Sequence, residues 1–244
     1  MTHSKLFSVI AICALGFGFT YWQDQNSSPK VTISVQTKGN TFQWNTIVPY
    51  TITVSDAEDG NTEYNEIPSN EVLLVARYFP DSTLIKKDPA REQMVHHDAV
   101  LAMSKALCFN CHAAKANLIG PSFEQVAVRY KNADGAVDRL TKIIIDGSTG
   151  TWGDLRMPPH PDLAVHQVSE MVTWILRYNS DPDLIYFVGS EGALRTKNKP
   201  LNASPAGVYL LTASYMDHGA KNPSNEFRAP GKRGQHTLVL KSPE

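Results

Sequence analysis

The sequence predicts an all-α domain of four short helices inserted into an immunoglobulin-like β-sandwich that the N- and C-terminal segments build together. Three observations support this mixed α and β class. Apolar residues alternate up to Pro80, recur at helical spacings between about residues 89 and 179, and alternate again from Leu184. Each β-rich flank alone buries too little apolar surface to fold well, whereas together they reach an ordinary sandwich size.

Composition narrows the classes of protein to which the chain can belong. It has 244 residues, of which 42% are hydrophobic, with 23 basic and 24 acidic side chains. This balance argues against a dedicated nucleic-acid binder, and the apolar content excludes a disordered chain. Three cysteines are too few for a small disulfide scaffold, and a single long apolar segment excludes a multi-span membrane protein.

Residues 1–26 are predicted to be a signal peptide or a membrane anchor. Lys5 precedes an apolar run over residues 6–22, and a polar stretch follows, as in secretory signals. Gly16 and Gly18 make a poor cleavage signal, so a tether to the inner membrane through residues 6–22 is the alternative. In both cases we expect an exported protein, in the periplasm or at the cell surface.

Residues 27–87 are predicted to be the first part of the sandwich. Turn formers separate three strand-like runs, which cover residues 30–36, 48–56 and 71–79.

An acidic turn follows the second of these runs. It contains Asp56, Glu58 and Asp59 beside Gly60. Carboxylates in such a loop could hold calcium, although a solvated turn is the commoner interpretation.

Residues 88–181 are predicted to be the helical domain. Apolar residues recur there three, four and seven positions apart, in four groups that begin at Val100, Phe123, Val137 and Val165. We expect this insert to begin and end close together and to have a core of its own.

Residues 182–244 are predicted to complete the sandwich. Strand-like runs cover residues 184–188, 207–215 and 236–242. Strands from 30–80 should then be hydrogen-bonded neighbours of strands from 206–241. The alternative is two separate small β appendages on either side of the helical domain.

One short motif predicts the chemistry of the protein, and its residues are Cys108-Phe109-Asn110-Cys111-His112. C-x-x-C-H is the attachment sequence of haem c, because two thiols at this spacing reach the two vinyl groups of one porphyrin. The next residue, His112, is then the proximal iron ligand. A structural zinc site would need a second pair of ligands, and a thioredoxin-like motif would open a helix rather than follow one.

Residues of roughly 90 to 180 resemble a bacterial class I cytochrome c. Beyond the haem motif, the similar positions are Gly120-Pro121, Trp152-Gly153 and Met157-Pro158-Pro159. The resemblance implies that the Pro121 carbonyl accepts a hydrogen bond from the proximal imidazole and that Trp152 packs near a haem propionate. It also implies that Met157 is the distal ligand. Arg156 departs from the family pattern and is expected to be solvated.

Two side chains are candidates for the sixth ligand of the haem iron. Met157 lies in a proline-flanked loop, and His160 follows three residues later. Met103 and Met171 fall on apolar helix faces, where a role in core packing is the ordinary explanation. We therefore expect Met157 as the distal ligand, with His160 and an open site as alternatives.

The β-rich flanks resemble an immunoglobulin-like or PKD-like module, with residues 48–60 as an early strand and turn. The whole arrangement is more loosely similar to cytochrome-bearing segments of secreted bacterial sugar dehydrogenases. No dehydrogenase domain is recognisable in the sequence.

These features together predict an electron carrier and not an enzyme. One covalent haem c with His112 and Met157 as ligands would exchange single electrons with donor and acceptor proteins. One alternative is a haem enzyme or gas-binding protein with an open sixth site. The other is a binding or adhesion module with an accessory cytochrome, for which Trp44 and Tyr50 would be exposed binding residues rather than core.

Overall fold

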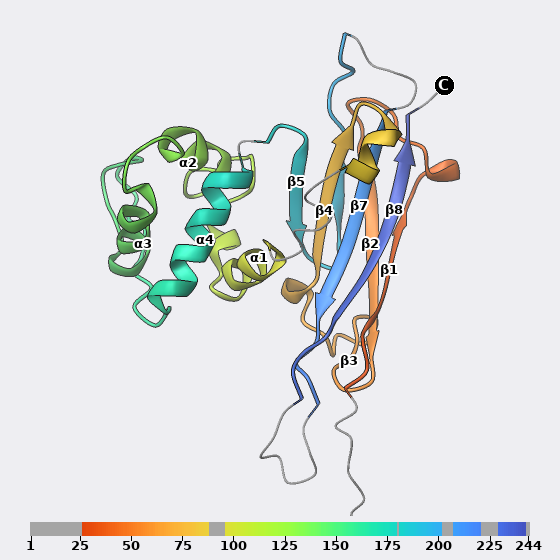
Figure 1. Cartoon of the computed structure of the whole chain (residues 1–244), viewed down its shortest axis with the longest axis horizontal. Coiled ribbons are helices and arrows are strands. Elements are labelled where there is room, and N and C mark those ends of the chain that lie inside the picture. Colours follow the sequence, from red (N-terminus) through yellow and green to blue (C-terminus); the bar gives the residue numbers. More distant parts are fainter. Residues whose placement is uncertain (1–25, 88–95, 180, 202–206, 221–228, 243–244) are drawn as a thin grey trace, which may run out of the picture.

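The computed structural model describes residues 26–87, 96–179, 181–201, 207–220 and 229–242. Two antiparallel sheets stand beside a group of four α-helices (Figure 1). Apart from Asn26, the predicted signal or anchor lies outside the described residues. No helix within the described ranges is long and apolar enough to cross a membrane.

The first sheet contains β1, β2, β3 and β6, and the second has the order β5-β4-β7-β8. The strands are β1 (Lys30–Val35), β2 (Ile47–Asp56), β3 (Gly60–Asn61), β4 (Leu73–Phe79), β5 (Leu184–Val188), β6 (Glu191–Arg195), β7 (Val208–Met216) and β8 (Arg233–Lys241). The helices are α1 (His96–Lys105), α2 (Phe123–Tyr130), α3 (Ala136–Asp146) and α4 (Val165–Tyr178).

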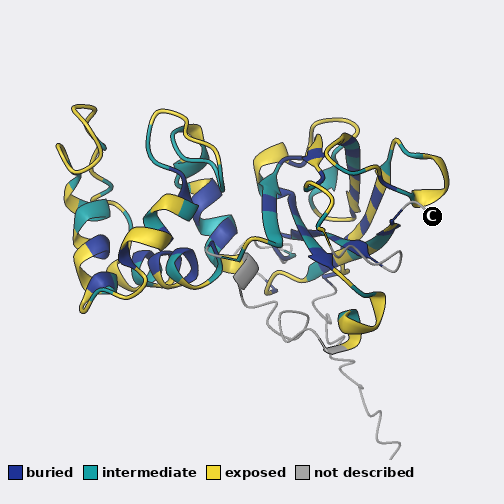
Figure 2. Cartoon of the chain, turned by 90° about the horizontal axis from the view of Figure 1, so that it is seen from above, coloured by how far each residue is buried: buried dark blue, intermediate teal, exposed yellow. Residues whose placement is uncertain are grey.

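The two sheets share one apolar core. Successive side chains of a strand point to opposite faces, and in β1 and β2 buried positions accordingly alternate with more exposed ones. Ile33 and Ile52 of the first sheet belong to the same buried cluster as Leu74 and Leu211 of the second. Figure 2 shows this alternation as dark blue and yellow bands along the strands.

Both ends of the chain contribute to each sheet, as the sequence predicted. In the second sheet β4 pairs with β7 over the register Leu73↔Ser214 to Phe79↔Val208. In the first sheet β2 pairs with β6 from Ile47↔Arg195 to Thr51↔Glu191. The two flanks are therefore one structural unit, while its immunoglobulin-like topology stays a prediction.

The helical segment leaves and rejoins the second sheet at neighbouring strands. β4 and β5 are antiparallel partners, with Arg77 opposite Leu184. Beyond this pair the Tyr78 amide donates to the Asp183 carbonyl at 2.9 Å, and the Arg77 guanidinium contacts the Asp181 carboxylate at 3.0 Å. The departing and returning chains thus lie side by side, as expected for an insertion.

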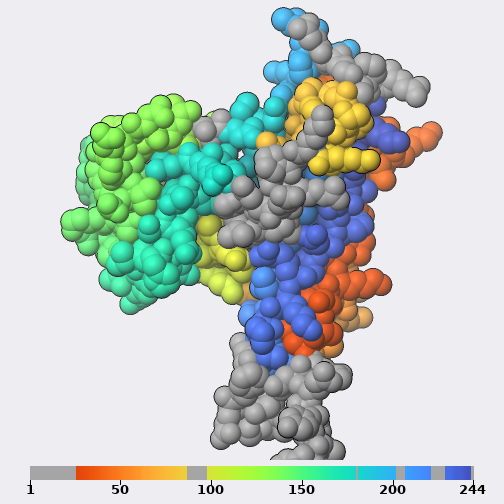
Figure 3. All heavy atoms as spheres, viewed as in Figure 1, coloured from red at the N-terminus to blue at the C-terminus, as the bar shows by residue number. Residues whose placement is uncertain are grey.

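The expectation of a separate helical core holds only in part. One cluster, with Leu140 and Val172, belongs to the helices alone, but a second is shared with the sandwich. Leu73 of β4 and Tyr186 of β5 belong to the same buried cluster as Val100, Met103 and Trp174 of the helices. The Tyr186 ring packs edge-on against Trp174 at 4.7 Å between centroids. The physical reason is that β5 is apolar along its whole length, so its second face needs a cover, and the helices provide it (Figures 1 and 3).

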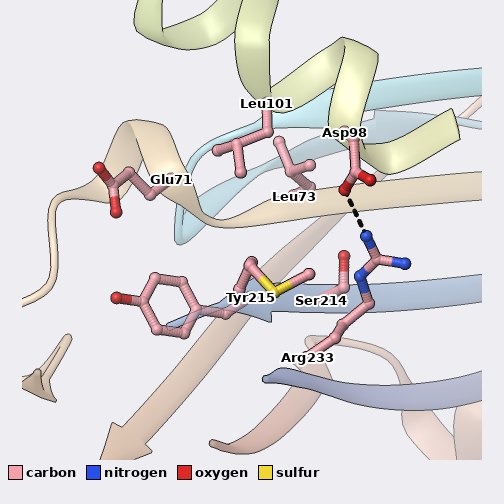
Figure 4. A pocket seen from close by; sticks show the side chains of 8 residues that line it. Glu71, Leu73, Asp98, Leu101, Ser214, Tyr215 and Arg233 are labelled. Atoms are coloured by element: carbon pink, nitrogen blue, oxygen red, sulfur yellow. Dashed lines mark hydrogen bonds and ion pairs between the residues drawn. The ribbon is translucent and has the colours of Figure 1, made fainter. Parts of the chain in front are cut away.

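Helix α1 meets the second sheet through a small polar crevice, seen from close by in Figure 4. The Arg233 guanidinium contacts Asp98 of α1 at 2.6 Å, and Glu71, Leu101 and Tyr215 also line the crevice. Its volume of about 10 Å³ is at the lower limit for one water molecule. It is therefore a packing junction and not a ligand site.

Candidate functional site

The haem-attachment motif directly follows helix α1. Leu107 adopts the left-handed conformation, with φ of 60°, and this ends the helix. A single 3-10 turn then covers Cys108–Asn110, and the His112 amide donates to the Cys108 carbonyl at 2.9 Å. This tight turn holds the two cysteines and the histidine on one short stretch of backbone.

The His112 ring is held from two sides. Its Nδ1 lies 2.7 Å from the Pro121 carbonyl oxygen, which can only accept a hydrogen bond, so Nδ1 carries the proton. The ring also stacks on Phe123 at 5.4 Å with an angle of 25° between the planes. This arrangement leaves Nε2 as the unprotonated nitrogen that can ligate a metal, with the basicity that a carbonyl partner adds.

Gly120 makes this approach of the imidazole possible. A Cβ atom on Gly120 would lie 2.4 Å from His112 Cε1 and 2.8 Å from its Nδ1. Only glycine leaves room there, which explains why it precedes Pro121. The sequence pointed to Gly120 and Pro121 only through the resemblance to a known family. The structure gives the steric reason why the first of them is a glycine.

Replacing Gly120 by alanine should therefore displace the His112 ring. We expect a loss of about 1–3 kcal/mol in unfolding free energy, as for other overpacked sites, together with a changed Soret band. Denaturant unfolding and an absorption spectrum measure the two effects. The control is Gly39→Ala, which meets no atom within 4 Å but has φ of 65°. It should cost stability without moving the Soret band, and an unchanged spectrum in Gly120→Ala would contradict the prediction.

The segment after the motif is clamped to helix α2. The Gly120 amide donates to the Cys111 carbonyl at 2.9 Å, and the Phe123 amide donates to the Ala113 carbonyl at 3.0 Å. Ser122 caps α2 in a reciprocal pair with Gln125, with both hydrogen bonds at 3.1 Å. The His112 imidazole, which stacks on Phe123, therefore packs against the capped start of a helix.

Both motif cysteines are free thiols in half-buried positions. Burial raises the pKa of Cys108 to about 11, so this thiol is neutral at pH 7. Between the cysteines, Phe109 packs edge-on against Phe123 at 5.7 Å and against Tyr186 of β5 at 6.0 Å. The motif is thus tied both to α2 and to the second sheet.

Met157 lies in a loop that is fastened to the end of α3. Its amide donates to the Ser148 carbonyl at 2.8 Å, and the Ser148 amide donates back to the Met157 carbonyl at 3.1 Å. Gly147, with φ of 79°, allows this close pairing, since a Cβ there would lie 2.8 Å from the Met157 oxygen. The His160 amide bonds to the Ile144 carbonyl at 3.1 Å. The backbone of the loop is therefore fixed on both sides of Met157.

Trp152 is held by a cation that sequence reasoning missed. The Arg129 guanidinium lies 4.7 Å from the centre of the indole ring and donates to the Thr151 carbonyl at 3.3 Å. Trp152 itself remains 43% exposed, and Arg156 is exposed as expected. No regular spacing links Arg129 to Trp152, so the sequence contains no signal for this pair.

The structure thus gathers the predicted residues in two groups. Cys108, Cys111, His112 and Pro121 form one, and Trp152 with Met157 belongs to the other. Within the described ranges, no hydrogen bond or ring contact joins the second group to His112. The pairing of Met157 with His112 on one iron therefore stays a prediction.

The donor set fits haem c better than a structural metal ion. Zinc sites need about four protein ligands, and no group of three or more His, Cys, Asp or Glu side chains that could hold a metal occurs among the described residues. Two free thiols beside an imidazole with an unprotonated Nε2 instead match covalent haem attachment with one axial nitrogen.

Comparison with known proteins finds cytochromes that are similar to about a third of the chain. No family model matches the chain. Cytochrome c-551 from Allochromatium vinosum is 38% identical over 79 residues, which are 32% of this chain and 83% of the relative. Cytochrome c-551 from Ectopseudomonas mendocina is 39% identical over 69 residues, 28% of this chain and 83% of the relative. The crystal structure of Nitrosomonas europaea cytochrome c552 aligns with 31% of this chain and 93% of its own, at 31% identity and a TM-score of 0.30.

Proposed function

Because the chain belongs, through its helical domain, to the family of the c-551 and c-552 cytochromes, we propose that it is an exported one-electron carrier with His112 and Met157 as axial ligands. Its cofactor is one covalently bound haem c. The observation that carries the proposal is the His112 imidazole, oriented by the Pro121 carbonyl at 2.7 Å directly after two free thiols.

Each residue of the site has a defined task in this proposal. Cys108 and Cys111 hold the haem through two thioethers, and the bound haem supplies a one-electron Fe(III)/Fe(II) couple. His112 donates its Nδ1 proton to Pro121 and presents Nε2 to the iron. Met157 offers a soft, neutral thioether, which favours ferrous iron and raises the potential relative to a second histidine.

The surface beside the motif suits brief contacts with redox partners. Leu107, Leu118 and Ile119 are apolar and exposed, with Ile119 at 63%. They flank the haem motif in the sequence, whereas Phe109 is partly buried against Phe123. A small apolar patch of this kind supports weak, short-lived docking, as electron transfer between soluble proteins requires.

Two other functions receive less support. An adhesion module would expose its aromatic residues, but Tyr50 is buried in the sandwich, and Trp44 packs edge-on against Phe42 at 5.0 Å. Tyr50 is therefore a core residue, and Trp44 is partly buried against the same core. A haem enzyme or gas binder needs an open sixth position, and the fixed loop around Met157 favours a protein ligand there instead.

A redox titration of the haem-loaded protein tests the proposed function. We expect a reversible transition that follows a one-electron Nernst curve, with low-spin spectra in both oxidation states. Carbon monoxide should not bind the ferrous protein, because Met157 occupies the sixth position. Ready carbon monoxide binding would instead support the enzyme or gas-binding alternative, and the added ligand imidazole serves as a control for access to the ferric iron.

A further inference from the structure

Among the residues that the structure describes, three buried side-chain oxygens at one end of the sandwich have no hydrogen-bond partner. They are Asn26 Oδ1, Asp56 Oδ2 and Asp217 Oδ2. The three residues are 3%, 8% and 3% exposed, so their side chains are almost wholly removed from bulk solvent. Buried oxygens of this kind are rare, because each unpaired polar atom opposes folding.

These oxygens come from segments that meet in space. Asn26 precedes β1, Asp56 ends β2, and Asp217 follows β7, at the end of the sandwich where β3 is labelled in Figure 1. Asn26 Nδ2 donates to Asp217 Oδ1 at 2.9 Å, across 191 residues of sequence. The turn that begins at Asp56 lies beside both other segments. Glu58 of this turn accepts from the hydroxyl of Ser27, the neighbour of Asn26, at 3.1 Å. Asp59 of the same turn accepts from the amide of His218, the neighbour of Asp217, at 2.8 Å.

The hydrogen bonds of Asn26 and Asp217 fix which of their side-chain atoms stay unpaired. Asn26 Nδ2 also donates to the Pro230 carbonyl at 3.0 Å, and both of its partners are acceptors, so the amide cannot be reversed. Asp217 Oδ1 receives the amides of Gly219 and Lys232 at 2.7 and 3.0 Å, while Oδ2 receives none. The amide nitrogen of Asn26 and Oδ1 of Asp217 are thus committed, and Asn26 Oδ1 and Asp217 Oδ2 are left without a partner.

Glu58 and Asp59, the other acids of the turn, already accept hydrogen bonds. Glu58 accepts from the Ser27 hydroxyl at 3.1 Å. Asp59 Oδ2 accepts from the Tyr215 hydroxyl and the His218 amide, both at 2.8 Å. The Lys232 ammonium donates to the Asn26 backbone carbonyl and not to the free carboxylate oxygens. The acidic turn is thus no uniform solvated patch. Within the described part of the chain, no ion pair involves Asp56 or Asp217, and one oxygen of each stays unpaired.

We propose that Asn26 Oδ1, Asp56 Oδ2 and Asp217 Oδ2 are ligands of a calcium ion. Only oxygen donors are offered, as hard divalent cations require, and Ca²⁺ takes about six to eight of them in flexible geometry. A cation there would neutralise two buried carboxylates at once. This site lies in the sandwich, and it does not depend on the haem or on the proposed electron transfer.

The position of the site suggests what the ion does. It would tie the residue that precedes β1 to the ends of β2 and β7, and so join the two sheets where the chain enters the sandwich. Calcium sites of extracellular modules bind with Kd of about 10⁻⁴–10⁻³ M, which suits a structural ion in an exported protein.

Calcium titration of the EDTA-treated full-length protein tests the site, by calorimetry and by thermal unfolding followed in the near-UV aromatic signal. We expect one ion per chain and a rise in Tm of roughly 5–10 °C at a hundred-fold excess over Kd. Asp56→Asn and Asp217→Asn should abolish most of this rise. In EDTA both variants should be at least as stable as the wild type, because each keeps its bonded oxygen and loses an unpaired charge.

The matched control is Asp134→Asn, an exposed acid between α2 and α3, which should keep the full response. Absence of calorimetric binding to the wild type overturns the proposal, whether or not the variants fold. So does an equal rise in Tm with NaCl at the same ionic strength, or a full rise in both sandwich variants. A lower Tm of both variants in EDTA would show that the carboxylates stabilise the fold without an ion, and would also overturn it.

Discussion

The double substitution of Cys108 and Cys111 by alanine should abolish haem retention on a denaturing gel. The thioether bonds are the only covalent link proposed between haem and protein, and both motif cysteines are free thiols in the structure. Axial ligation by itself does not survive denaturation. Haem staining should therefore fall from a strong band at about 27 kDa to background, and a mass spectrum should show the unmodified chain.

The matched control is the third cysteine of the sequence, Cys13, which lies outside the motif. Cys13→Ala should retain the stain, because the proposal gives this thiol no part in haem attachment. Staining that persists in the double variant would show a different covalent link and overturn the assignment of the motif.

Met157→Ala should remove the weak long-wavelength band by which sulfur-to-iron ligation is recognised in the oxidised protein. With the thioether gone, imidazole should bind the ferric iron readily, and the midpoint potential should fall by on the order of 0.1 V, within the ~0.8 V range that axial ligands span. Absorption spectra and a redox titration measure both effects. The attachment of haem itself should be unchanged, since Met157 takes no part in it.

Two further variants separate the candidate sixth ligands. His160→Ala should keep the band, because only the backbone of His160 is fixed to α3. Met103→Leu should keep it too, since Met103 is buried in the core shared by the helices and the second sheet. If the band survives in Met157→Ala and disappears in His160→Ala, the distal ligand is His160 and the proposal for Met157 is wrong.

The parts of the site that the sequence revealed are those in which the interacting residues are close in the chain. The thiols at Cys108 and Cys111 are three positions apart, and a tight turn places them together regardless of the rest of the fold. Pro121 lies nine positions after His112, within reach of one loop, and its carbonyl makes the contact that the resemblance implies. Local geometry of this kind is specified by residue type and spacing.

Parts that the sequence did not reveal depend on side chains from distant segments. No spacing in the sequence predicts the contact of Arg129 with Trp152. Nor does the sequence distinguish Tyr186 from the other apolar residues of its strand, although its ring contacts both Phe109 and Trp174. The sequence also predicted that the sandwich and the helical domain would each have an apolar core of its own. One face of β5 is covered by helices instead, and no periodicity within β5 tells which element will cover it.

By itself the sequence determined the helical and β-rich segments, the haem motif and the joining of the two flanks, since each follows from period, spacing or the area a short segment can bury. The pairing of β4 with β7 then bore out the joining of the flanks. Only the tertiary structure decided that the helices and the sheet share a core, and that Asn26 bonds to Asp217. The bond between Asn26 and Asp217 joins residues 191 positions apart, and no spacing rule in the sequence predicts it or the cover of β5.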